Sequence, residues 1–127
     1  MRPRPAAREK PVHWVGSSKR DLVALPAEVV RAVGYDLSAV QHGGQPPSAK
    51  PWRGLGPGVW ELVETAGAGT YRAIYTVQLR KAIYVLHAFQ KKSPTGIRTS
   101  ATDVALVRRR LKAAREDYEV RYGKEAD

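Results

Sequence analysis

Apolar residues recur along the chain with two different spacings, which predict strands in its middle and helices on either side. Residues 70–77 and 82–89 are rich in β-branched and aromatic residues and are separated by a short, mostly polar segment, so they predict two neighbouring strands. Residues 59–64 predict a third strand, and the glycines within residues 66–69 supply the turn that follows it. Together the three segments predict an antiparallel meander.

Helical spacing of apolar residues predicts a helix before this meander and another after it. The first should begin after Pro26 and end at Gly43-Gly44, with an apolar stripe of Val29, Val33, Leu37 and Val40. The second begins with the start signal of Ser100 and Asp103, and its apolar stripe is Val104, Val107, Leu111, Ala114 and Tyr118. Nearer the N-terminus we expect a short strand at residues 13–15 and a short helix capped by Ser18.

Proline and glycine mark the segments that should hold no regular structure. Residues 45–58 contain four prolines and three glycines, so we expect a connecting loop there. Residues 1–11 alternate proline with basic residues and should be a disordered basic arm, and residues 123–127 a C-terminal tail. A chain of 127 residues is too short for two substantial domains. Residues 12–122 should therefore form a single domain.

The predicted order of elements indicates the α+β class, with a small antiparallel sheet of about four strands. The N-terminal helices and the C-terminal helix should pack against that sheet. No apolar run approaches the length that spans a membrane, so we expect a soluble protein without a membrane partner. The absence of cysteine excludes disulfides and thiolate chemistry and fits a cytoplasmic location.

The net charge of the chain is formally +10, with a pI of about 10.2. A field of this sign attracts nucleic acid, anionic lipid or an acidic protein. Residues 65–102 contain no Asp or Glu, while their basic residues are Arg72, Arg80, Lys81, Lys91, Lys92 and Arg98. Such an acid-free patch across two neighbouring strands favours a phosphate-bearing polyanion, of which nucleic acid is the commonest.

Other candidate chemistry is limited. The histidines are His13, His42 and His87, which stand far apart without acidic neighbours at ligand spacing, so we expect no metal. No cofactor is expected either. Glu61 and Glu64 are three apart in a strand and should point to opposite faces, which is unsuitable for a carboxylate pair acting on one bond.

Two further basic segments have alternative interpretations. Lys50, Trp52 and Arg53 lie in the proline-rich loop, where the indole could stack on a base, although packing of the loop onto the domain is favoured. The final helix carries Arg108, Arg109, Lys112 and Arg115 opposite its apolar stripe. A solvated face is favoured there over a DNA-recognition helix, because acidic residues follow closely.

Three blocks follow one another along the chain: Val59-Trp60-Glu61-Leu62, Tyr71-Arg72-Ala73-Ile74-Tyr75 and Leu86-His87-Ala88-Phe89-Gln90-Lys91-Lys92. In this order and spacing they resemble HigB-like toxins of the RelE/ParE superfamily of bacterial toxin-antitoxin modules. The resemblance covers roughly residues 12–122. It implies a compact α+β domain with helices packed on one side of a small antiparallel sheet.

The resemblance also implies a metal-independent endoribonuclease that cleaves mRNA, on or off the ribosome, and a cognate antitoxin, usually of helix-turn-helix type. Arg72 matches the arginine of the family's Tyr-Arg block and would hold the scissile phosphate, while Lys91 and Lys92 match its paired lysines. Cleavage by the substrate's own 2′-hydroxyl needs such cations and two proton transfers. The interpretation depends on Arg72 not being locked in an internal ion pair away from both lysines.

His87 and Tyr75 each have two interpretations. His87 could be a general acid or base or a buried hydrogen-bonding group. Tyr75 could contact RNA, but it shares a strand face with Tyr71 and Ala73 that is favoured as core.

Two departures from the family pattern leave ribosome dependence open. Val63 stands where relatives often have arginine, and residues 64–67 lack the lysines that ribosome-dependent relatives frequently have. Lys50, Arg53 or Arg98 could then supply RNA-binding cations from loops. Alternative functions are a non-catalytic toxin of the same fold that inhibits a protein such as DNA gyrase, and a small basic nucleic-acid-binding module.

Overall fold

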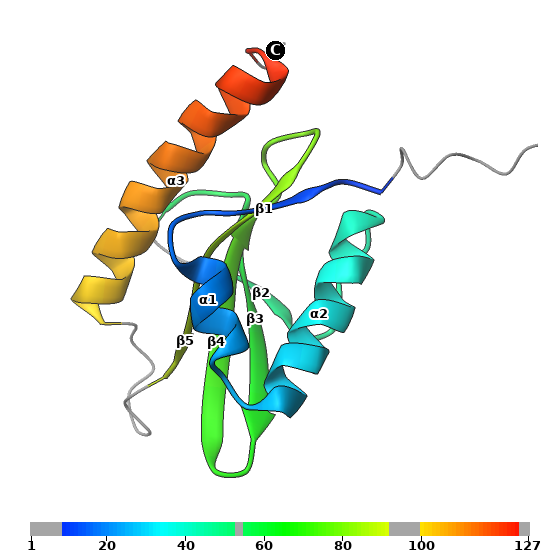
Figure 1. Cartoon of the computed structure of the whole chain (residues 1–127), viewed down its shortest axis with the longest axis vertical. Helices are drawn as coiled ribbons and strands as arrows, with labels where there is room; N and C mark the ends of the chain where they lie inside the picture. Colours follow the sequence, from blue (N-terminus) through cyan, green and yellow to red (C-terminus); the bar gives the residue numbers. More distant parts are fainter. Residues whose placement is uncertain (1–8, 53–54, 92–99, 125–127) are drawn as a thin grey trace, which may run out of the picture.

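The computed structural model describes residues 9–52, 55–91 and 100–124. The elements that it describes are β1 (Val12–Trp14), α1 (Ser18–Val23), α2 (Ala27–Gln41), β2 (Ala49–Pro51), β3 (Val59–Ala66), β4 (Gly69–Thr76), β5 (Ile83–Gln90) and α3 (Ala101–Tyr122). Figure 1 shows them around a central sheet. The α+β class and the predicted meander β3–β4–β5 are confirmed.

The sheet has strand order β1-β5-β4-β3-β2 and is mixed rather than wholly antiparallel. β1 pairs with β5 in parallel, whereas the other pairs are antiparallel. The expectation that residues 45–58 hold no regular structure is wrong for residues 49–51, which form the edge strand β2. Pro51 is tolerated there because an edge strand has one side on which no backbone N–H is needed.

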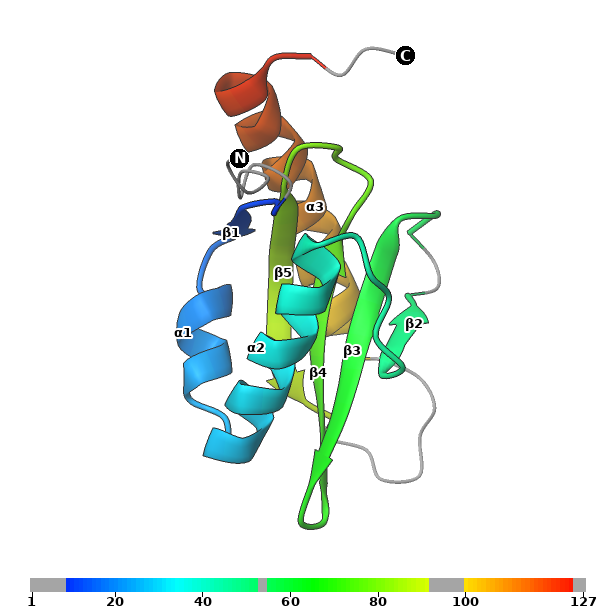
Figure 2. The same ribbon diagram turned by 90° about the vertical axis from the view of Figure 1, so that its right-hand side faces the viewer.

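Helices cover both faces of the sheet, so the helices-on-one-side arrangement implied by the resemblance is wrong. α1 and α2 lie on one face and α3 on the other (Figures 1 and 2). The reason lies in β4 and β5, whose consecutive residues are nearly all buried. Because successive side chains of a strand point to opposite faces, such strands require cover on both.

Each layer has its own core. The apolar stripe of α2 packs with Leu62, Tyr71, Ala73 and Tyr75 of the sheet. On the other face Val107, Leu111, Ala114 and Tyr118 of α3 pack against a second set, which includes Val59, Ile74, Tyr84 and Leu86. The apolar stripes predicted for both helices therefore match the buried residues, apart from the half-buried Val104.

The helix ends follow the predicted signals, with one exception. The N-cap Ser100 accepts a hydrogen bond from the backbone N–H of Asp103 at 3.1 Å, and Gly43 (φ +89°) follows the C-cap of α2. Ser18, however, does not cap α1. It lies inside the helix, and its buried hydroxyl donates to the carbonyl of Val85 at 3.1 Å.

The predicted terminal segments lie largely outside the described residues, which begin at Glu9 and end at Lys124. Lys10, placed in the disordered arm by the sequence, instead bonds to α2. Its backbone N–H donates to the carbonyl of Gln41 at 3.0 Å, and its carbonyl accepts from the Gln41 amide at 2.8 Å.

The C-terminal half of α3 is tied to the sheet by tyrosine hydroxyl groups. Tyr84 of β5 donates to the Asp117 carboxylate at 2.6 Å, and Tyr118 accepts from the backbone N–H of Lys81 at 3.0 Å. Tyr122 shares a 2.7 Å hydrogen bond with the Nε2 atom of His13 in β1. Burial, then the bond to Asp117, raises the pKa of Tyr84, so its hydroxyl remains a proton donor in this contact.

A pair of carboxyl groups joins α2 to β3 on the opposite side of the sheet. Burial, followed by a hydrogen bond with Asp36, raises the pKa of Glu64 to about 7. The Ser48 hydroxyl donates a hydrogen bond to the carboxylate of Asp36 at 2.6 Å. Oε2 of Glu64 is buried, and burial together with the neighbouring Asp36 favours the protonated form of Glu64. Glu61 instead forms an ion pair with Arg72 on the side of the sheet that α3 covers. The two glutamates therefore point to opposite faces, as predicted.

Glu64→Gln should flatten the pH dependence of stability. The folded-state pKa of Glu64 lies above its ordinary value of 4.5, so the folded protein binds this proton more tightly and stability falls as pH rises from about 4.5 to about 7. Glutamine donates to Asp36 at every pH. We expect the melting temperature of the variant at about pH 8 to exceed that of the wild type by about 3 °C, with little difference near pH 5. Thermal unfolding followed by circular dichroism tests this, with Glu119→Gln as the exposed control, and equal pH slopes would contradict the raised pKa of Glu64.

Leu111→Ala should show how strongly α3 contributes to the fold. Leu111 is 4% exposed in the core beneath α3, so truncation leaves a cavity and should lower the free energy of unfolding by about 2–5 kcal/mol. Val120→Ala is the matched control on the same helix, because Val120 is 87% exposed and should cost less than about 0.5 kcal/mol. Urea denaturation measures both values, and equal losses would contradict the packing of α3.

Candidate functional site

Polar residues from four strands share the face of the sheet that α3 covers. Lys50 of β2 lies opposite Glu61 of β3, Glu61 opposite Ile74 of β4, and Ile74 opposite His87 of β5. Directly opposed residues of antiparallel strands point to the same side, and Ile74 belongs to the core beneath α3. Lys50, Glu61 and His87 therefore form one row across the sheet.

Arg72 lies in the next row on the same face. It is opposite Val63 of β3 and Phe89 of β5, and Phe89 packs with the core on the α3 side. Lys91 follows directly after β5, where its backbone N–H donates to the carbonyl of Thr70 at 2.8 Å. The structure thus brings four of the sequence-predicted site residues to one region: Lys50, Arg72, His87 and Lys91.

A β-bulge is what places His87 on this face. Tyr75 pairs with Val85 and Ile74 pairs with His87, so Leu86 is an extra residue in β5. Val85 packs on the α1 and α2 side, and strict alternation would have placed His87 there too. Because the bulge adds one residue, both Leu86 and His87 point toward α3.

His87 is held from above by the first turn of α3. Its Nε2 lies 2.8 Å from Oδ1 of Asp103, and its ring stacks on Phe89 with centroids 4.5 Å apart. Asp103 is oriented in turn by Ser100, whose hydroxyl donates to Oδ2 at 2.7 Å. The second ring nitrogen of His87, Nδ1, is buried and has no hydrogen-bond partner, in a side chain that is 9% exposed.

Arg72 forms an internal ion pair with Glu61, at 3.2 Å between Nε and Oε1. Both side chains are 13% exposed, and the two atoms are not aligned as a hydrogen bond. The phosphate-site interpretation required that Arg72 not be locked in an internal ion pair away from both lysines, so this ion pair meets the first half of that excluding condition. The pair is not isolated from the predicted cations, however, since the charges of Lys50 and Lys91 both act on Glu61.

The electrostatics of Glu61 combine opposing effects. Burial raises its pKa, while Arg72, Lys50 and Lys91, in that order, lower it, and the net direction is upward. The effect of burial on the pKa of Glu61 is thus larger than the combined effect of the three cations.

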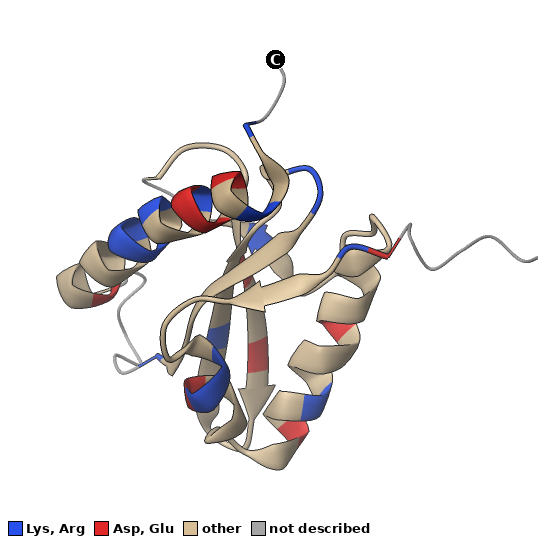
Figure 3. Ribbon diagram, turned by 45° about the horizontal axis from the view of Figure 1, so that its top comes forward, with Lys and Arg blue, Asp and Glu red and all other residues tan. Residues whose placement is uncertain are grey.

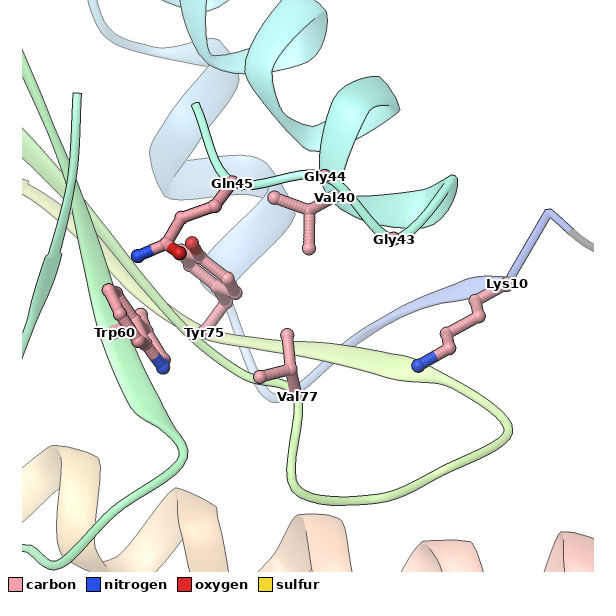
Figure 4. Close-up of a pocket in the computed structure, with 8 residues that line it drawn as sticks. All are labelled: Lys10, Val40, Gly43, Gly44, Gln45, Trp60, Tyr75 and Val77. Carbon is pink, nitrogen blue, oxygen red and sulfur yellow. The ribbon is translucent and has the colours of Figure 1, made fainter. Parts of the chain in front are cut away.

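Tyr75 does not belong to this face. It is 2% exposed in the core beneath α2, and burial raises its pKa to about 12. Together with Trp60, Gln45 and Lys10 it lines a cavity of about 280 Å³ beside the C-terminus of α2 (Figure 4). The structure thus separates Tyr75 from Arg72 by the thickness of the sheet.

Three predicted cations, Arg53, Lys92 and Arg98, lie outside the described residues. Their neighbour Trp52 is 4% exposed and packs in the core on the α3 side, so the packing interpretation of that indole is confirmed. Its Nε1 is buried without a hydrogen-bond partner. Five buried side-chain atoms of the described residues have no hydrogen bond. Four of them belong to Trp52, Glu61, Arg72 and His87, and the fifth belongs to Glu64.

The basic residues of α3 have different roles. Figure 3 shows basic and acidic residues along this helix. Arg108, Arg109 and Lys112 are exposed, whereas Arg110 donates to the carbonyl of Leu86 at 2.9 Å and to Ser17 at 3.0 Å. Arg115 donates to Gln78. The outer side of α3 is therefore solvated, while Arg110 fastens the helix to the bulge.

Two residues of the site were not identified from the sequence, namely Glu61 and Asp103. Glu61 was judged only as half of a carboxylate pair, although an acidic residue at a buried strand position is itself a signal for a cationic partner. Asp103 was recognised only as a helix-start residue. No sequence signal links it to His87, because the contact depends on the bulge and on where α3 docks.

Two further observations concern the described part of the chain. No three side chains of His, Asp or Glu gather there closely enough to hold a metal ion. No helix within residues 9–52, 55–91 and 100–124 combines the length and apolar character needed to cross a bilayer.

Comparison with known proteins gives a family match and a structural likeness. The model of the family described as "Phage derived protein Gp49-like (DUF891)" matches residues 20–112. The toxin-antitoxin complex RelBE2 from Mycobacterium tuberculosis contains a chain with 24% sequence identity and a TM-score of 0.43, which covers 64% of this chain and 96% of that one. No curated protein matches the sequence.

The family match covers the site face from Lys50 to Lys91 and continues into α3. This family is of the RelE/HigB toxin type, which confirms the superfamily resemblance, while the HigB subtype stays a prediction. The chain belongs to the Gp49-like family of phage-derived proteins.

Proposed function

We propose that this protein is the toxin of a bacterial toxin-antitoxin pair and acts as a metal-independent endoribonuclease on mRNA. The observation that carries the proposal is the gathering of Lys50, Arg72, His87 and Lys91 on one sheet face. Family membership supports the toxin role. Cations beside groups able to transfer protons are what RNA cleavage through the 2′-hydroxyl requires.

Phosphate binding would begin with an exchange of partners at Arg72. The scissile phosphodiester would replace Glu61 as the anion on the guanidinium, and Lys50 and Lys91 would add positive charge beside it. A phosphate offers several acceptors and a fixed charge, whereas burial makes ionisation of Glu61 costly. The exchange therefore favours the phosphate once RNA is present.

The chemistry then needs no bound metal. The ribose 2′-oxygen attacks phosphorus and loses its proton to a base, the bond to the 5′-oxygen breaks, and that oxygen takes up a proton. The products are a 2′,3′-cyclic phosphate and a 5′-hydroxyl. Arg72 and Lys91 would stabilise the charge on the pentavalent phosphorane, while His87 and Glu61 are the titratable side chains on this face that could move protons.

The partners of the protein follow from the same charges. A cognate antitoxin, of helix-turn-helix type by the resemblance, would neutralise the toxin through an acidic surface that suits a chain of net charge +10. Action on mRNA places the toxin in the cytoplasm. Whether cleavage takes place on the ribosome stays open, because residues 64–67 lack the lysines of ribosome-dependent relatives.

Arg72→Ala and Lys91→Ala should each lower RNA cleavage by about 100-fold, because each removes a cation from the phosphate site. Expression in a bacterium, with mapping of RNA 5′ ends, should reveal new 5′-hydroxyl ends and growth arrest for the wild type and a near absence of both for the variants. Arg109→Ala is the matched control, since it removes an exposed cation away from the sheet face. Circular dichroism verifies that every variant folds.

The outcomes of this experiment separate the alternatives. Undiminished cleavage in both variants would overturn the site assignment. Growth arrest with intact RNA would instead indicate inhibition of a protein such as DNA gyrase. Nucleic-acid binding with a steep salt dependence but without toxicity would indicate a binding module.

A further inference from the structure

The bond between His87 and Asp103 fixes which nitrogen of the imidazole ring carries hydrogen. A carboxylate oxygen accepts hydrogen bonds only, so the 2.8 Å contact requires a proton on Nε2 of His87. In the neutral ring the other nitrogen, Nδ1, then carries the lone pair. That atom is buried and without a hydrogen-bond partner, although an unpaired buried acceptor is normally avoided in folded proteins.

We propose that Asp103 is a positioning residue that holds His87 in the Nε2–H tautomer, so that Nδ1 accepts the proton of the RNA 2′-hydroxyl. The inference rests on the proposed function and names the general base within it. Asp103 does not touch the substrate. It acts through His87 by fixing the tautomer and ring orientation, and it would stabilise the imidazolium that forms when Nδ1 takes up the proton.

The residues around His87 and Asp103 orient these two side chains in addition to capping α3. Ser100 holds Oδ2 of Asp103 at 2.7 Å, which leaves Oδ1 directed to the ring. Phe89 stacks on the imidazole and limits its rotation. The bulge that turns His87 toward α3 is fastened by the bond from Arg110 to the Leu86 carbonyl. Each contact restricts the ring, and none occupies Nδ1.

The burial of Nδ1 has a consequence for substrate binding. Because Nδ1 has no exposed surface in the free protein, whatever covers it must move before a ribose hydroxyl can reach it.

The tautomer can be measured without any assay of activity. In ¹⁵N-labelled protein at about pH 8, above the ordinary histidine range, the ¹⁵N resonances of the ring distinguish a bare nitrogen from one that carries hydrogen. We expect Nε2–H and a bare Nδ1 for His87, assigned by the loss of its signals in His87→Gln. In Asp103→Asn the amide can donate to Nε2, so this variant should shift the ring toward Nδ1–H. In Asp103→Ala the anchor is lost, and the ring keeps only its intrinsic tautomer preference.

Glu116→Ala is the matched control, because it removes an exposed carboxylate from the same helix and leaves the Asp103 carboxylate beside His87. It should keep the Nε2–H tautomer and most of the cleavage, whereas Asp103→Ala should lower cleavage by about 100-fold. A wild-type ring with hydrogen on Nδ1, an unchanged tautomer in Asp103→Asn, or full cleavage by Asp103→Ala would overturn the inference. Absence of cleavage by the wild type would overturn the proposed function instead, and the tautomer would still decide the role of Asp103.

Discussion

The β-bulge at Leu86 determines which side chains can meet on the face of the sheet beneath α3. β5 is buried on both sides, so its alternation is fixed by packing at Val85 on one face and Tyr84 on the other. One extra residue reverses that alternation and moves His87 to the face that carries Glu61 and Arg72. Without the bulge the histidine would lie in the core beneath α2, away from both.

A second constraint is the cost of burying charge. Arg72 and Glu61 sit 3.2 Å apart with little exposure, and removing either partner of such a pair leaves the other charge uncompensated. Burial nonetheless keeps the pKa of Glu61 raised despite three nearby cations. The arrangement is thus a cationic site that contains an internal anion. The same physics appears across the sheet, where burial beside Asp36 raises the pKa of Glu64.

Local sequence signals predicted most of the elements, because strands 59–66, 69–76 and 83–90 and helices 27–41 and 101–122 follow strong periodicity. The edge strand β2 was missed, since prolines dominate its composition and its pairing with β3 is not a local property. The position of α3 opposite α2 was missed for a similar reason. The position of α3 follows from the need to bury both faces of β4 and β5, and this need is evident only in the assembled sheet.

The site was predictable only as far as local sequence signals reach. Lys50, Arg72, His87 and Lys91 were selected by residue type and by resemblance, and the register of the strands places them together. The partners of these residues were not predictable. Glu61 reaches Arg72 from the neighbouring row of the sheet, and Asp103 reaches His87 across 16 residues of chain. Both contacts are set by tertiary structure, as is the separation of Tyr75 onto the other face.

The most direct test of the account is to map where an uncleavable RNA binds. An oligoribonucleotide with single 2′-deoxy substitutions lacks the attacking hydroxyl and can be titrated into ¹⁵N-labelled protein. The account predicts the largest chemical-shift changes at Glu61, Arg72, His87 and Lys91, with the α2-side residue Tyr75 little affected. Changes confined to the exposed basic side of α3, at Arg108, Arg109 and Lys112, would contradict it.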